Sequence, residues 1–146
     1  MTMAVTTWTA ATTPDNVWKV LADGWLFPLW VVGACRIRDV DATWPEPGSR
    51  LHHSVGVWPV VRDDNTEVLS CDPGERIELQ ARAWPLGEAR VIIALRPTGE
   101  GTEVTIEEDL THGPGSLLPR PLRAGALHVR NIETLKRLAM LAEGRS

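Results

Sequence analysis

The sequence predicts an α+β fold in which a curved antiparallel sheet of about six to seven strands wraps around one long C-terminal helix. Short runs rich in β-branched and aromatic residues recur over residues 3–110 and are separated by turn signals. A single long helical pattern follows them near the C-terminus. Two short helical segments come directly after the first strand, which is an unusual opening for such a sheet.

The opening of the chain predicts one strand and then two short helices. Residues 3–10 are rich in Thr and Val, as strands are. Thr13 is a good helix N-cap, and Pro14 suits the first helical turn. We expect Gly24 to end this helix in a left-handed conformation. A second short apolar segment then runs to Trp30.

The middle of the chain predicts an antiparallel meander, because its strands are short and are joined by turns rich in Pro and Gly. A tight polar hairpin is expected over residues 62–65, where charged and amide side chains cluster. The predicted strands cover residues 34–41, 50–58, 66–71, 76–84, 88–96 and 102–110.

The last element is a helix from about residue 119 to residue 143. It has nothing else long to pack on, so its apolar stripe must face the sheet. A curved sheet and a straight helix do not meet everywhere, and a cavity between them is therefore expected. The predicted buried stripe consists of His128, Ile132, Leu135, Leu138, Ala139 and Ala142.

Length and composition limit the classes of protein to consider. The 146 residues predict a single domain over residues 1–146, and the net charge of −4 gives no basic footprint for nucleic acid. Cys35 and Cys71 do not form a disulfide framework. Residues 1–11 do not have the pattern of a secretory signal, and the apolar runs are too short for stable membrane insertion. We therefore expect a cytoplasmic protein.

Several segments besides the opening resemble those of one superfamily. They are Gly48–Arg50 after a proline-rich turn, Asp72–Arg76 before the central strand, Gly101–Thr105 at the start of the last strand, and His128–Leu138 in the final helix. The chain resembles the START-like or Bet v 1-like (SRPBCC) superfamily over nearly its whole length, in particular the polyketide cyclase/dehydrase branch. The resemblance implies the helix-grip fold. Its motifs are turn glycines, caps and packed tryptophans, and none of them is catalytic.

Strand phase predicts which side chains face the cavity. In the strand over residues 50–58, His53 shares the phase of the apolar positions, and in the last strand Glu108 shares the phase of Ile106. Trp18 is expected in the core, whereas Trp30 is the tryptophan expected to contact a ligand. The predicted ligand-binding residues are Trp30, His53, Val55, Leu69, Leu79, Ile93, Ile106, Glu108 and His128.

Two functions remain open at this level. The first is binding of an apolar small molecule, such as a lipid or a polyketide, without changing it. The second is a polyketide cyclase or dehydratase that acts on a poly-β-keto substrate, with Glu108, His53 and His128 converging as acid and base groups in an apolar cavity. The structural alternative is that Glu108 is solvated, that His53 only hydrogen-bonds a backbone carbonyl, and that His128 only forms part of the wall.

No cofactor or metal ion is predicted. His52 and His53 are adjacent in a strand, so their side chains diverge and cannot chelate together. No other pair has the spacing of zinc ligands. The expected partner is an apolar small molecule, and a homodimer through exposed tryptophans is left open. The chain contains no tyrosine, which removes one common general acid and favours binding over catalysis.

Overall fold

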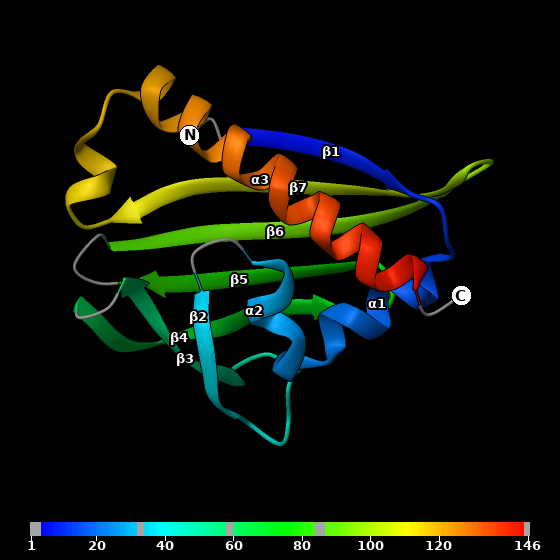
Figure 1. Cartoon of the computed structure of the whole chain (residues 1–146), viewed down its shortest axis with the longest axis horizontal. Coiled ribbons are helices and arrows are strands. Elements are labelled where there is room, and N and C mark those ends of the chain that lie inside the picture. Colours follow the sequence, from blue (N-terminus) through cyan, green and yellow to red (C-terminus); the bar gives the residue numbers. More distant parts are fainter. Residues whose placement is uncertain (1–3, 32–33, 58–59, 84–86, 145–146) are drawn as a thin grey trace.

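The computed structural model describes residues 4–31, 34–57, 60–83 and 87–144. A seven-stranded sheet carries one long helix on one face (Figure 1). The strands are β1 (Ala4–Ala10), β2 (Ala34–Val40), β3 (Arg50–Val57), β4 (Val60–Asp72), β5 (Arg76–Ala83), β6 (Gly87–Thr98) and β7 (Gly101–His112). The helices are α1 (Pro14–Ala22), η1 (Gly24–Leu26), α2 (Phe27–Trp30), η2 (Pro114–Leu117) and α3 (Arg120–Glu143).

The sheet is antiparallel throughout, in the order β1-β7-β6-β5-β4-β3-β2. Strands β1 and β2 follow one another in the chain but lie at opposite edges of the sheet. The connection through α1, η1 and α2 spans that distance on the same side of the sheet as α3 (Figure 1). The predicted α+β helix-grip fold, with two short helices after the first strand, is confirmed.

The predicted polar hairpin over residues 62–65 is wrong, because these residues lie inside β4. They pair with β3 in a continuous register from Val57↔Val60 to Arg50↔Glu67. Asp63 finds its partners on other strands: it pairs with Arg38 of β2, and its Oδ1 accepts a hydrogen bond from Ser54 of β3 at 3.1 Å. Turn propensity depends on local sequence only, so it cannot show that polar side chains in a strand have partners on other strands.

A β-bulge in β4 reverses the predicted phase of Leu69. The pairing with β5 shifts between Val68 and Ser70, so one extra residue enters the strand at this point. Val68 is buried at 1% exposure, whereas Leu69 is 43% exposed. The prediction that Leu69 faces inward is wrong, because simple strand alternation does not allow for the extra residue at this position.

The buried face of α3 includes polar side chains that the predicted stripe does not contain. Arg123, Asn131 and Thr134 are buried, whereas His128 and Ile132 are exposed. The predicted burial of His128 and Ile132 is therefore wrong. Hydrophobic periodicity cannot detect a helix face on which buried polar groups are held by partners from the sheet.

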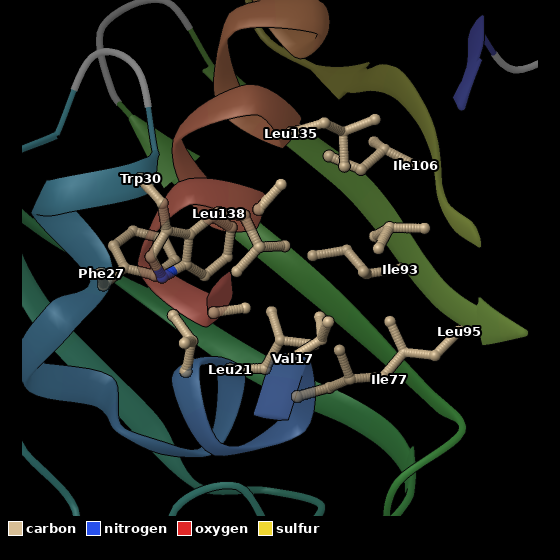
Figure 2. Packing of buried hydrophobic residues seen from close by; sticks show 14 of the residues in the cluster. Val17, Leu21, Phe27, Trp30, Ile77, Ile93, Leu95, Ile106, Leu135 and Leu138 are labelled. Atoms are coloured by element: carbon tan, nitrogen blue, oxygen red, sulfur yellow. The ribbon is translucent and has the colours of Figure 1, made fainter. Parts of the chain in front are cut away.

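The core lies between the sheet and the three main helices (Figure 2). It joins Val17 and Leu21 of α1 with Leu135 and Leu138 of α3, and Trp18 packs against its edge. The buried sheet residues of this core include Ile77, Ile93, Leu95 and Ile106. Most of these strand positions follow the predicted period-two alternation.

Gly24 has a role other than the predicted one. Its backbone is not left-handed, and the residue that closes α1 is Asp23. A Cβ atom at Gly24 would lie 2.3 Å from Leu51 Cδ2 and 2.9 Å from Val40 Cγ1. Glycine is needed here because the helical connection approaches β2 and β3 too closely for any side chain.

Candidate functional site

A small cavity lies between the sheet and the helices α2 and α3. Its volume is about 50 Å³, less than the volume that two water molecules take in the liquid. Strands β5, β6 and β7 form its floor, through Leu79, Ala81, Val91, Ile93 and Ile106. Phe27 and Trp30 of α2, together with Val31, form an apolar wall.

The opposite end of the cavity is polar. Glu108 of β7 is only 2% exposed, and its carboxylate accepts a short hydrogen bond from the guanidinium of Arg130 on α3. The same Arg130 group donates to Asn131 Oδ1 at 3.3 Å. Together with Thr134, these residues form a polar patch in an otherwise apolar cavity. The paired charges of Glu108 and Arg130 cancel, which lowers the cost of burying them.

Two side chains that line the cavity carry buried donors without a partner. Trp30 Nε1 and Asn131 Nδ2 are shielded from solvent and have no hydrogen-bond partner among the described residues. A buried donor left unsatisfied costs about 1–3 kcal/mol. Such donors are therefore points at which a bound molecule can contribute favourable contacts.

His53 lies behind the aromatic wall. Its ring stacks on Phe27 with 5.8 Å between ring centroids, and His53 Nε2 is 2.9 Å from Thr66 Oγ1. Burial lowers the pKa of the His53 imidazole, while the nearby Asp64 carboxylate acts to raise it. His53 supports Phe27 and does not belong to the cavity lining.

The structure does not bring the three predicted catalytic residues together. Of the three, only Glu108 lines the cavity, and its carboxylate is held by Arg130. His128 is an exposed residue of α3 that lies outside the cavity lining, and its Nδ1 atom hydrogen-bonds Oγ1 of the buried Thr6 of β1 at 2.8 Å. The predicted convergence of Glu108, His53 and His128 in one cavity is therefore not observed.

The other predicted ligand-binding residues divide into three groups. Trp30, Leu79, Ile93 and Ile106 line the cavity. Leu69 faces solvent. The side chain of Val55 lies outside the described part of the structure.

Sequence reasoning missed the polar residues on α3. Arg130, Asn131 and Thr134 line the cavity, although the helix pattern predicted that its sheet-facing stripe is apolar. A usable signal was present: Asn131 and Thr134 are three residues apart and share a face with Leu135 and Leu138. Phe27 was also missed, because the short apolar segment before Trp30 has no periodicity of its own.

Residues 1–143 match the family described as polyketide cyclase/dehydrase and lipid transport. The chain belongs to this family. Its members typically bind hydrophobic ligands. Among curated proteins, none matches this sequence.

Solved structures share the fold of this family member at low sequence identity. Protein NE0264 from Nitrosomonas europaea is 18% identical, with a TM-score of 0.74 over 99% of this chain and 96% of that one. The di-domain ARO/CYC StfQ from the steffimycin biosynthetic pathway is 17% identical, with a TM-score of 0.74 over 97% of this chain and 50% of that one. Ara h 8.0201 is 13% identical, with a TM-score of 0.71 over 96% of both chains.

Two further findings concern the described residues of this family member. None of the helices found there is long and apolar enough to cross a lipid bilayer. Within the same ranges, no three His, Cys, Asp or Glu side chains gather in a group that could hold a metal ion.

Proposed function

We propose that the protein binds an apolar small molecule in the cavity between the sheet and the helices α2 and α3. The observation that carries the proposal is the lining itself. Apolar side chains from three strands and from α2 meet one polar patch on α3 and β7, which is the usual composition of a small-molecule site. Membership of a family that typically binds hydrophobic ligands supports the same conclusion.

The cavity must widen to take up such a ligand, because about 50 Å³ is too small for a lipid or a polyketide. The floor belongs to paired strands, which resist movement. The aromatic wall is carried by α2, which has only four residues and is too short to be stable without its packing contacts. On ligand entry the aromatic wall on α2 therefore yields rather than the sheet, and Phe27 and Trp30 continue to line the widened cavity.

Binding without chemistry is the simpler use of this cavity. Glu108 is held in an ion pair, His53 lies behind Phe27, and His128 is outside the cavity. A cyclase or dehydratase needs an acid or a base that can reach the substrate. Of these three side chains only Glu108 lines the cavity, and its carboxylate is already bound by Arg130.

The proposal is tested by filling the cavity. Ala81 lines its floor, so Ala81→Phe places a ring in the ligand space. We expect native mass spectrometry of the purified wild type to show a co-purified apolar ligand. We also expect Ala81→Phe to weaken binding of the neutral probe N-phenyl-1-naphthylamine by about tenfold or more, measured by fluorescence titration.

The matched control is Ala94→Phe. Ala94 lies on β6 next to Ile93 in sequence and therefore on the other face of the sheet, away from the cavity. The Ala94→Phe variant should bind N-phenyl-1-naphthylamine with the same affinity as the wild type. Equal weakening in both variants, or a wild type that neither retains a ligand nor binds the probe, would contradict the proposal.

A further inference from the structure

Trp30 and Asn131 bring buried donors to the cavity from different elements. Trp30 on α2 is 4% exposed and Asn131 on α3 is 1% exposed. Neither Trp30 Nε1 nor Asn131 Nδ2 has a hydrogen-bond partner in the described part of the chain. Both side chains line the same small cavity. Both atoms donate hydrogen bonds and neither can accept one, so the partner they lack is an acceptor.

The orientation of the Asn131 amide follows from its neighbour. Arg130 donates to Asn131 Oδ1 at 3.3 Å. A flipped amide would place its NH₂ group against the guanidinium, where two donors would face one another. The Asn131 oxygen is thus committed to Arg130, and the nitrogen remains available to a ligand.

The charges around this polar end favour a neutral ligand. Arg130 is the cation in the cavity lining, and it is already paired with the buried Glu108. A carboxylate ligand would have to share Arg130 with Glu108 and would be repelled by it. A neutral acceptor can use the two free donors without disturbing the ion pair.

Resting on the proposed function, we propose that this cavity selects compact neutral carbonyl compounds, whose oxygen accepts hydrogen bonds from Asn131 Nδ2 and Trp30 Nε1. The rest of the ligand is hydrocarbon and lies on the apolar floor formed by Leu79, Ile93 and Ile106. A carbonyl group fits better than a hydroxyl group, because it accepts without adding a donor of its own. Asn131 and Trp30 are thereby the residues that determine specificity.

Three probes built on the same ring test this selectivity. Cyclohexanone, methylenecyclohexane and cyclohexanecarboxylate share a six-membered ring, and the first two differ only in C=O against C=CH₂. The cost of widening the cavity is therefore nearly the same for these two, so it cancels in the comparison. We expect cyclohexanone to bind roughly five- to tenfold more tightly than methylenecyclohexane, the effect of one net hydrogen bond or slightly more. The carboxylate should bind more weakly than the ketone.

Nuclear magnetic resonance reports the contact directly. In ¹⁵N-labelled protein, the Trp30 indole signal is identified by its loss in Trp30→Phe. We expect cyclohexanone, but not methylenecyclohexane, to move this signal and the Asn131 side-chain amide signals downfield. Asn131→Leu keeps the size of the side chain and removes the donor. We expect it to abolish most of the preference for the ketone and to leave the affinity for methylenecyclohexane unchanged. Trp25→Phe is the control, because Trp25 is 57% exposed and lies outside the cavity lining.

The outcomes separate the two proposals. If the ketone and the hydrocarbon bind equally, or if the ketone binds without moving either signal, the selectivity is wrong and the two donors hold only water. If the carboxylate binds most tightly, the charge argument is wrong. If none of the three probes binds, and N-phenyl-1-naphthylamine also fails to bind, the proposed function itself is overturned. The comparison of probes uses the wild-type protein and does not depend on whether Asn131→Leu folds.

Discussion

His53 shows how one buried polar side chain is held in this protein. The imidazole is 2% exposed, stacks on Phe27 and hydrogen-bonds Thr66. Burial lowers its pKa because the charged form loses its hydration; Asp64 opposes this effect, and the charges of Arg38 and His52 reinforce it. The neutral ring belongs to the packing behind the aromatic wall. His53 therefore connects the stability of that wall to pH.

The pH dependence has a defined sign. The folded pKa lies below the unfolded value of about 6.5, so the unfolded chain takes up the proton first. The stability from neutral His53 is complete above pH 6.5 and is lost as pH falls toward the folded pKa. We expect urea unfolding to show a smaller free energy of unfolding at pH 5.5 than at pH 7.5, and a shallower decrease in His53→Gln. Equal decreases in both proteins would show that His53 does not contribute.

At the scale of elements, one buried ion pair fastens the start of α3 to the sheet. Arg123 Nε donates to Asp109 Oδ1 of β7 at 2.8 Å. The same guanidinium donates to the carbonyl oxygen of Ser116 at 2.8 Å and to that of Leu118 at 3.2 Å. The N-cap position of α3, Pro119, makes no side-chain cap hydrogen bond. Arg123 thus satisfies carbonyls of the preceding loop while it binds the strand.

We expect Arg123→Met to destabilise the fold by about 3–5 kcal/mol, because Asp109 would be left buried without its ion-pair partner. The matched control is Arg137→Met, since Arg137 makes only an exposed pair with Glu133, one helical turn away. That change should cost less than about 0.5 kcal/mol. Chemical denaturation of the two variants measures the difference. Similar losses would mean that the Arg123–Asp109 pair does not anchor α3.

At the scale of the whole molecule, the helical connection must fit against the far end of the sheet. It carries the chain from one edge strand, β1, to the other, β2. Gly24 lies where this connection packs against β3 and β2, next to the side chains of Leu51 and Val40. The space for a methyl group is absent there, so the approach of the connection to the sheet depends on this one glycine.

We expect Gly24→Ala to lower the free energy of unfolding by about 1–3 kcal/mol, because a Cβ atom would push the connection away from Leu51 and Val40. Gly125→Ala should have the opposite sign. Gly125 is exposed in α3 with open space around it, and alanine favours the helix there by roughly 0.5–1 kcal/mol. Thermal unfolding compares the two variants. If Gly24→Ala left the thermal stability unchanged, the contact with Leu51 and Val40 would relax without cost.

The fold class, the order of the elements and most of the cavity floor could be predicted from the amino-acid sequence. These properties follow from local patterns, such as the period-two alternation around Ile93 and Ile106 and the cap at Thr13. Local patterns are visible in sequence because they reflect the backbone geometry of a few neighbouring residues.

Which polar groups are buried, and which groups they contact, depends on how distant parts of the chain pack together. The bulge next to Leu69, the pairing of Glu108 with Arg130 and the unsatisfied amide of Asn131 all depend on residues distant in the chain. A helix or strand does not reveal which partner a polar side chain will find across the core. The floor of the site was therefore predictable, whereas its polar end, on which the proposed specificity rests, was not.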